Sequence, residues 1–292
     1  MKITELFERG EFVVSAEVGP PKGFHVEHLL EEAKMYLSDI TAVNVTDNQS
    51  SVMRLGSLAM CKALKDEGLT PIYQLTCRDR NRIALQSDLL SAAMFGIENL
   101  LLLTGDHTKL GDHPQAKPVF DLDSVSLIHA VTRLESGVDL GGNELVGEPP
   151  KFAKGAVVSP CSDSVDAQLA KMERKVRAGA DYFQTQAVFE PEKFIKFMEK
   201  AKEFGKPVQV GIIIPKSAGM AKFMNNNVAG IHVPDEMIEE LAKDKERTKA
   251  GITGVEIAAR IIKECRPYCQ GVHIMALGWE SKVPELLKQA GI

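Results

Sequence analysis

The sequence of 292 residues predicts a (β/α)8 barrel, of the TIM-barrel class, formed as a single domain over residues 1–292. Three observations favour this fold. Eight short β-branched runs alternate with amphipathic stretches, as the strands and helices of a barrel do. The runs are apolar nearly throughout, which is typical of parallel strands buried on both faces. The turn after the first run, Gly19-Pro20-Pro21-Lys22-Gly23, lacks the G-x-G-x-x-G of an open dinucleotide-binding sheet.

The expected elements follow one another in regular alternation. Strands are expected over residues 12–18, 41–46, 71–76, 99–104, 155–159, 181–186, 208–214 and 271–277. Apolar residues spaced by three and four predict helices over residues 26–37, 56–65, 82–93, 124–134, 164–178 and 190–203. The last two helices have start signals, at Ser162-Asp163 and at Pro191-Glu192.

Two segments interrupt this alternation. Residues 136–154 are rich in Gly, Pro and Glu and predict a long loop before the fifth strand. Residues 216–260 have room for two or three helices, so the crossover before the last strand is expected to be enlarged. Neither segment has the composition of an interdomain linker, which favours one domain.

Charge and cysteine content narrow the class of protein. The chain has 35 Lys and Arg against 40 Asp and Glu, a net charge of −5, and no basic stripe, which argues against nucleic-acid and membrane-surface binding. No apolar stretch is long enough to span a bilayer, and the acidic N-terminal run lacks the form of a signal peptide. Five scattered cysteines, an odd number, suit reduced thiols. We therefore expect a cytoplasmic protein.

Glu17 is the first candidate for chemistry, because reactive groups of such barrels lie where strands end. It closes the first strand, follows the apolar Val13, Val14 and Ala16, and precedes two prolines. A partly buried carboxyl in a rigid turn is prepared to donate a proton near neutral pH. A structural carboxylate that only accepts hydrogen bonds in the barrel mouth is an equal alternative on position alone.

Asp106 is the second candidate, since it follows four leucines and the Thr104-Gly105 turn. Gly105 lets the backbone approach a ligand closely, although an Asp that only caps the turn is as good an interpretation. The pairs Asp106-His107 and Asp112-His113 suggest a metal site, but no third ligand follows at a diagnostic spacing. We therefore expect no metal.

Together, the strand ends resemble the methylenetetrahydrofolate reductase family. The order and spacing of the motifs agree over nearly the whole chain, and the set is far more specific than any single motif. The matching motifs are Glu17-Val18-Gly19-Pro20-Pro21 for E-x-x-P-P, Val45-Thr46, Leu75-Thr76-Cys77, Gly105-Asp106, Arg174-Lys175-Val176 with Ala178-Gly179-Ala180, and Thr185-Gln186.

The resemblance implies a flavin, FAD or possibly FMN, across the barrel mouth with a folate stacked on it. It implies reduction of 5,10-methylenetetrahydrofolate to 5-methyltetrahydrofolate, a step of one-carbon metabolism that serves methionine biosynthesis. Glu17 would be the general acid and Asp106 would tune the flavin and pterin. By the same resemblance, the cofactor would contact Thr46, Gln74, Thr104, Gly105, Asp106, Ser159, Gln168, Lys175 (at its phosphate) and Ala180, and the folate would contact Gln186 and Gly219 or Met220.

The chain also departs from the better-known bacterial members. Gln74, Thr104, Ser159 and Gln168 stand where those members have His, Arg, Tyr and Asp. Gly219 or Met220 replaces a Phe that stacks on folate and nicotinamide. Electrons are therefore expected from NAD(P)H or, as our hypothesis, from an electron-delivering protein subunit, within an oligomer or hetero-complex.

Two other function classes remain as alternatives. Asn44-Val45-Thr46-Asp47 is similar to the N-V-T-x-D stretch of pterin-binding barrels that transfer a methyl group from methyltetrahydrofolate to a corrinoid protein. That motif is short, and it explains neither the E-x-x-P-P turn nor the T-Q strand end. A non-catalytic barrel subunit is the second alternative, and the joint presence of Glu17, Asp106 and Gln186 speaks against it.

Overall fold

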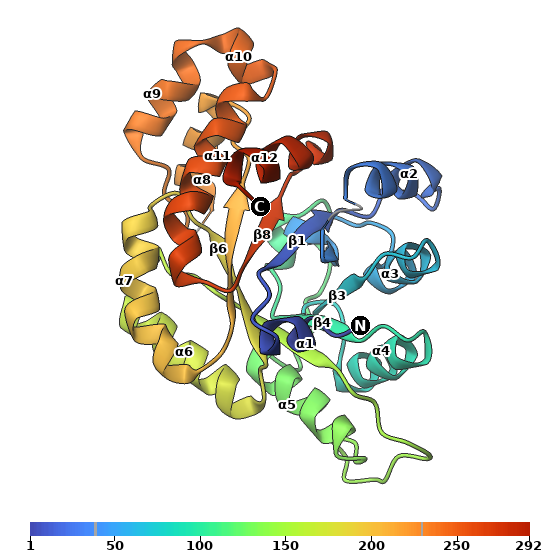
Figure 1. Cartoon of the computed structure of the whole chain (residues 1–292). Helices are drawn as coiled ribbons and strands as arrows, with labels where there is room; N and C mark the ends of the chain where they lie inside the picture. The colour runs from blue at the N-terminus through green and yellow to red at the C-terminus, as the bar shows by residue number, and fades with distance from the viewer. Residues whose placement is uncertain (38–39, 229) are drawn as a thin grey trace.

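A computed structural model describes residues 1–37, 40–228 and 230–292. Eight parallel strands form one closed barrel in the order β1 to β8, and β8 pairs with β1 to close it (Figure 1). This confirms the predicted (β/α)8 class. The strands are β1 Val13–Val18, β2 Ala42–Val45, β3 Pro71–Thr76, β4 Asn99–Leu103, β5 Ala153–Val158, β6 Tyr182–Ala187, β7 Val208–Ile213 and β8 Gly271–Met275.

Helices follow the strands and surround the barrel (Figure 1). They are α1 Ile3–Glu8, α2 Glu27–Tyr36, α3 Ser57–Asp66, α4 Arg82–Met94, α5 Ser124–Glu135, α6 Val165–Ala178, α7 Pro191–Ala201, α8 Ala218–Asn227, α9 Asp235–Lys243, α10 Lys245–Lys249, α11 Ile252–Cys265 and α12 Val283–Ala290. Local chemistry sets their ends. The Ser164 hydroxyl accepts from Ala167 N at the start of α6, and Gly179 ends that helix at φ 113°.

The structure differs from the sequence prediction at three places. The loop predicted over residues 136–154 ends two residues earlier, because Ala153 and Lys154 already belong to β5. Lys154 obscured the strand start, yet its ammonium pairs with Glu135 and Asp181 at the barrel edge. The enlarged crossover contains four helices in its described part, α8 to α11, where two or three were expected. Helices α1 and α12 were not assigned.

The barrel interior changes character along its axis. Helix α1 closes the end where the strands begin, and the Ile3 amide donates to Asn99 Oδ1 over 2.9 Å. The first interior layer is apolar and consists of Ile3, Leu6, Val13, Ala42, Ile72, Leu101, Ala153 and Tyr182. The next layer, nearer the mouth, is buried and polar; it consists of Ser15, Asn44, Gln184, Gln209 and His273.

All five cysteines are buried and unpaired as disulfides. Burial raises the pKa of the Cys77 thiol to about 12 and those of Cys161 and Cys269 to about 11. It raises the pKa values of Cys61 and Cys265 as well. Across residues 1–37, 40–228 and 230–292, no helix is both long and apolar enough to cross a bilayer.

Candidate active site

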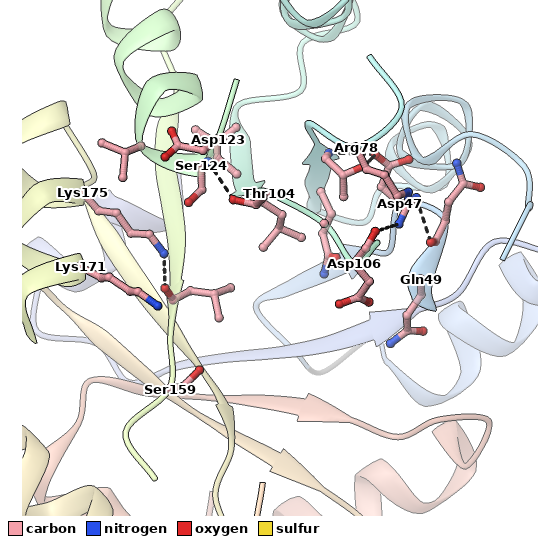
Figure 2. Close-up of a pocket in the computed structure, with 18 of the residues that line it drawn as sticks. Asp47, Gln49, Arg78, Thr104, Asp106, Asp123, Ser124, Ser159, Lys171 and Lys175 are labelled. Carbon is pink, nitrogen blue, oxygen red and sulfur yellow. Dashed lines mark hydrogen bonds between the residues drawn. The ribbon is translucent and has the colours of Figure 1, made fainter. Parts of the chain in front are cut away.

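Two cavities open at the barrel mouth. The first, of about 490 Å³, lies over the ends of β2 to β5 and beside α6 (Figure 2). Its walls differ in charge: α6 contributes Lys171, Arg174 and Lys175, and the strand ends contribute Asp47 and Asp106 among others. We call this space the cation-lined cavity.

The three cations of α6 share one helix face, because they are spaced by three and four residues. Lys175 is the most buried of the three, and its ammonium donates to Val157 O over 2.6 Å. Figure 2 marks this bond with a dashed line from Lys175. Burial lowers the pKa of this amine to about 8. A desolvated ammonium bonded to a neutral carbonyl has capacity for an anion such as a phosphate.

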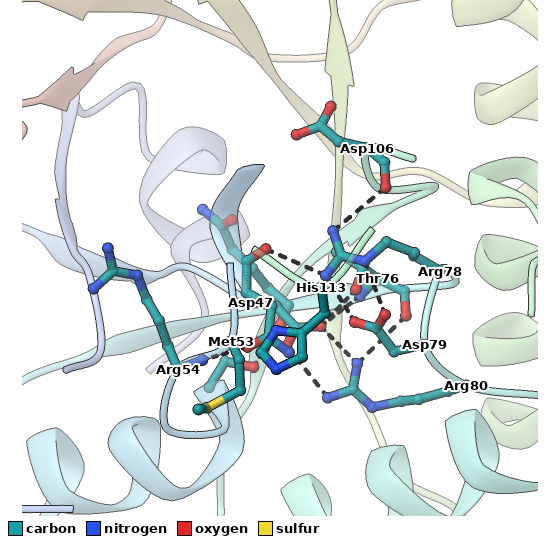
Figure 3. Close-up of polar contacts among 12 residues, drawn as sticks. Asp47, Met53, Arg54, Thr76, Arg78, Asp79, Arg80, Asp106 and His113 are labelled. Carbon is teal, nitrogen blue, oxygen red and sulfur yellow. Dashed lines mark hydrogen bonds and ion pairs between the residues drawn. The ribbon is translucent and has the colours of Figure 1, made fainter. Parts of the chain in front are cut away.

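Ion pairs fix the opposite wall of the cation-lined cavity (Figure 3). The Asp47 carboxylate is fully buried and receives Arg80 Nη1 at 2.7 Å. It also accepts from the amide of Thr76 at 2.9 Å and from its hydroxyl at 2.8 Å. Asp47 therefore fastens the end of β2 to the end of β3.

Arg78 connects three strand ends beneath the same wall. Its guanidinium is buried and donates to Asn48 O at 3.2 Å, Asp106 O at 3.5 Å and the Asp79 carboxylate at 2.7 Å. Gly105 has φ +91°, and a Cβ there would lie 3.2 Å from Arg78 Cβ. The turn that presents Asp106 is thus shaped by a glycine conformation and one buried cation.

The loop after β4 is fastened across the mouth. Asp112 pairs with Lys22, and it accepts the Met53 amide at 3.1 Å. A Cβ at Gly111 would lie 1.7 Å from Ser51 O, so only glycine allows this contact. Ser51 itself has φ 60°, a left-handed conformation uncommon outside glycine.

The second cavity, of about 430 Å³, lies between the ends of β1 and β8 and helix α2. Glu17 lines it, with a side chain 12% exposed. Glu17 Oε1 has Gln74 Nε2 and His273 Nε2 each at 3.4 Å. Gln49 lines both cavities, so the acid and the cation row border one continuous mouth. We call this space the Glu17 cavity.

Most residues assigned by sequence to the cofactor border the cation-lined cavity. They are Gln74, Thr104, Gly105, Asp106, Ser159, Gln168 and Lys175. Two of these side chains also accept hydrogen bonds from nearby backbone amides. Thr104 Oγ1 accepts the Ser124 amide at 3.1 Å, and Gln168 Oε1 accepts the Ser159 amide at 3.4 Å.

The other assigned residues lie outside both cavity linings. Thr46 is buried beside Gly19, and its hydroxyl has no hydrogen-bond partner among the described residues. Gln186 is two residues beyond the inward-facing Gln184 on β6. Gly219 and Met220 begin α8. Ala180 precedes β6, at the end of the barrel remote from the mouth.

Several site residues were missed from sequence. Lys171 shares a helix face with Lys175, and that spacing was a usable signal. Arg78, Arg80 and His273 gave no such signal, because each also depends on partners that come from other strands. Among the described residues, no group of three or more His, Cys, Asp or Glu is arranged to hold a metal ion.

Comparison with known proteins decides the family. The family model described as methylenetetrahydrofolate reductase matches residues 2–291. The chain belongs to the methylenetetrahydrofolate reductase family. It is therefore an enzyme of the reductase class, as the strand-end motifs predicted.

Named relatives are distant in sequence. The chain is 27% identical to 5,10-methylenetetrahydrofolate reductase of Salmonella typhimurium, over 87% of this chain and 82% of that protein. It is 26% identical to the Escherichia coli protein of the same name, with the same coverage. It is 27% identical to methylenetetrahydrofolate reductase 2 of Schizosaccharomyces pombe, of which it spans only 48%.

A solved structure shares the fold. An uncharacterized protein from Clostridium thermocellum, which binds two copies of 5-methyl-5,6,7,8-tetrahydrofolic acid, superposes with a TM-score of 0.69 at 14% identity, over 99% of this chain and 98% of that one. Dimethylmalate lyase gives a TM-score of 0.54 at 12% identity, over 100% of this chain and 88% of that one. At such identities the likeness concerns the barrel alone.

Proposed function

We propose that the chain reduces 5,10-methylenetetrahydrofolate to 5-methyltetrahydrofolate with a bound flavin. The observation that carries the proposal is the placement of a largely buried acid, Glu17, at the edge of a cation-lined cavity in a member of this family. The folate bound by the Clostridium thermocellum barrel supports the same substrate class.

The residues present fit a flavin nucleotide. The row of Lys171, Arg174 and Lys175 suits a phosphate, and Lys175 is desolvated there with only a carbonyl as partner among the described residues. Gly105 lines the same cavity at φ +91°, and a Cβ there would crowd Arg78 and Thr76, so glycine maintains the turn that brings Asp106 to this cavity. FAD is the form we propose, with FMN as the other candidate. Mass analysis of the nucleotide released by heat distinguishes them.

When bound, the flavin supplies the hydride that reduces the one-carbon unit. The protein supplies a proton and positioning. Glu17 donates its proton to the bridge nitrogen of the folate as the carbon–nitrogen bond of the N5–N10 bridge breaks. Water entering the Glu17 cavity returns a proton to the carboxylate afterwards.

The remaining roles follow from placement. Asp106, exposed at the rim of the cation-lined cavity, is proposed to tune the electrostatics of flavin and pterin. Gln186, near the end of β6, is proposed to bond the folate, and the start of α8 at Gly219 and Met220 is proposed to contact its outer part.

We propose that electrons reach the flavin from a partner protein, with NAD(P)H as the alternative. Gly219 and Met220 offer no aromatic ring for a nicotinamide, and a Cβ at Gly219 would meet only Ser217 Oγ, at 3.7 Å, among the described residues. Stopped-flow reduction of the isolated protein by NADH or NADPH tests this proposal. A catalytically useful rate would contradict it.

The reductase proposal is tested by the visible spectrum of the purified protein under anaerobic conditions. Adding 5-methyltetrahydrofolate should bleach the flavin band, because the half-reaction runs in reverse. A band that stays unchanged would leave a flavin protein with another substrate. No band after FAD or FMN is supplied would contradict the proposal and favour methyl transfer or a non-catalytic subunit.

A further inference from the structure

Helix α4 is apolar on two opposite faces. Its buried face packs on the barrel and contains Leu85, Leu89 and Ala92. Its outward face contains Ile83 and Met94, each 75% exposed, and Leu90, 41% exposed. The outer face of a surface helix is usually charged or polar, and a helix that is apolar on both sides is usually covered on both. The outward face of α4 therefore indicates an interaction surface.

Few charges lie on this helix. Only Arg82 and Asp88 of its 13 residues are charged, and both are paired within the chain, Arg82 with Asp121 and Asp88 with Arg80. By contrast, six of the 14 residues of α6 are charged. The outward face of α4 can thus be covered without burying an unpaired charge.

The outward residues of α4 form a line along the helix, which we call the α4 seam. They are Ile83, Ser87, Leu90 and Met94, and all four are exposed. Their spacing of four, three and four residues is that of helices that pack side by side in coiled coils. The seam is about 17 Å long. Its length and spacing suit a second helix as the partner.

The α4 seam is complementary to a copy of itself that runs in the opposite direction. Ile83 lies as far before the midpoint of the seam as Met94 lies after it, and Ser87 and Leu90 are related in the same way. A two-fold axis through the midpoint would place Ile83 against Met94 of the partner subunit. It would also place the small Ser87 against the larger Leu90 of the partner subunit, as a hole receives a knob.

The charges at the helix ends favour the same direction. The first turn of α4 has no acidic residue and its last turn has no basic one, so neither end of the helix dipole is neutralised by its own turn. Antiparallel pairing brings the positive end of each helix beside the negative end of the other. Parallel pairing would bring like ends together.

We propose that two copies of this chain associate through their α4 seams, antiparallel and about a two-fold axis. A stable dimer buries about 800 Å² on each partner, which is more than one seam provides. The loop between α5 and β5 supplies further contact: it projects beside α4 in Figure 1, where Leu140 N donates to Gln86 Oε1 over 2.8 Å, and its Val146 is fully exposed.

The proposed dimer leaves both active sites open. The first residue of α4 follows the mouth end of β3, so the helix starts at the mouth and runs away from it. Antiparallel pairing therefore directs the two mouths to opposite ends of the dimer. The inference uses neither the flavin nor the folate, so it does not depend on the proposed function.

Sedimentation velocity at micromolar concentration tests the proposal. The wild-type chain should sediment as a dimer, or as an even-numbered assembly of such dimers. Ile83→Lys and Met94→Glu each place a charge against an apolar side chain of the other copy, so each should raise the Kd of this contact by about 100-fold or more. A monomeric wild-type chain, or an unchanged mass in either variant, would overturn the proposal.

Mixing the two variants tests the antiparallel direction. In a mixed dimer, the ammonium introduced by Ile83→Lys meets the carboxylate introduced by Met94→Glu, and the other end of the seam retains its original pair. Two variants that fail to associate alone should therefore form a dimer together, which native mass spectrometry identifies by its mass. No recovery would overturn the proposal, because parallel pairing or a different protein on the seam predicts none.

Met35→Glu is the matched control, since Met35 lies on α2, outside the seam, and is 67% exposed. Its mass in solution should equal that of the wild-type chain, and an equal loss of association would overturn the proposal. Circular dichroism and urea unfolding establish that each variant is folded. Flavin content and folate reduction are measured separately, so failure of the proposed function and failure of the dimer are distinguished.

Discussion

The two cavities at the barrel mouth are held in shape by different forces. The wall of the cation-lined cavity is fixed by charge, through the Asp47–Arg80 pair and the buried guanidinium of Arg78. The Glu17 carboxyl instead contacts the amide of Gln74 and the ring of His273, each at 3.4 Å. Charge would suit a side that binds the phosphate of the proposed flavin. An uncharged amide such as that of Gln74 suits a carboxyl that, in the proposed mechanism, takes up and releases a proton.

The largest effect should come from breaking the charged wall. Arg80→Met leaves the Asp47 carboxylate buried without its cation, and we expect the free energy of unfolding to fall by about 3–5 kcal/mol. Urea unfolding measures this change. The control is Arg82→Met, which removes the exposed pair with Asp121 and should change stability little. A similar loss of unfolding free energy in both variants would show that the buried pair is no more important for stability than the surface pair.

Loss of the acid should be next in size and should affect chemistry alone. We expect Glu17→Gln to retain its flavin and unfold at the same urea concentration, but to lose folate reduction by about 100-fold or more. Glu32→Gln, in the same cavity and paired with His28, should remain active. Single-turnover reduction of methylenetetrahydrofolate measures the rate. Unchanged turnover of Glu17→Gln would make that carboxylate structural.

On the cation-lined side, substitutions should weaken cofactor binding and leave the chemistry intact. Lys175→Met removes the buried cation and should raise the flavin Kd by about 10-fold, with turnover restored at saturating flavin. Fluorescence titration of the apoprotein gives the Kd. Arg177→Met, on the same helix but exposed and paired with Glu173, is the control and should bind flavin normally. Equal binding by Lys175→Met would remove this lysine from the phosphate site.

The smallest effect concerns pH. The pKa of the Lys175 ammonium is about 8 in the free protein, lowered by burial, and a bound anion would raise it again. Flavin affinity should therefore be flat below pH 7 and fall as the pH rises through 8, by about fourfold between pH 7 and 8.5. Lys175→Met should not show this dependence. A slope of the opposite sign would mean that the amine binds as the neutral form.

The barrel was predictable because local sequence patterns indicate its strands and helices. Apolar runs located all eight strands to within about two residues, and the parallel closure followed from their number. Where a charge lies near the start of a strand, as Lys154 does in β5, hydropathy placed the boundary of the strand too late. The helices of the large crossover were undercounted because α10 has only 5 residues and Asp244 alone separates it from α9.

The site was predictable only where single positions are informative. Strand ends indicated Glu17 and Asp106, and the structure places both at the mouth. Arg80 and His273 could not be found that way, since each acquires its role from side chains on other strands. His273 lies within an otherwise apolar strand. Its ring contacts Ser15 and Glu17, which lie far earlier in the chain.

Alkylation of the buried thiols would measure how often the barrel opens. A thiol must ionise and meet the reagent before iodoacetamide can modify it, and all five cysteines are enclosed and hold their protons strongly. Cys61 and Cys77 belong to the β3 side of the barrel, and Cys265 and Cys269 to the β8 side. The alkylation rate of each pair therefore measures how often that half of the barrel opens, and no added probe is needed.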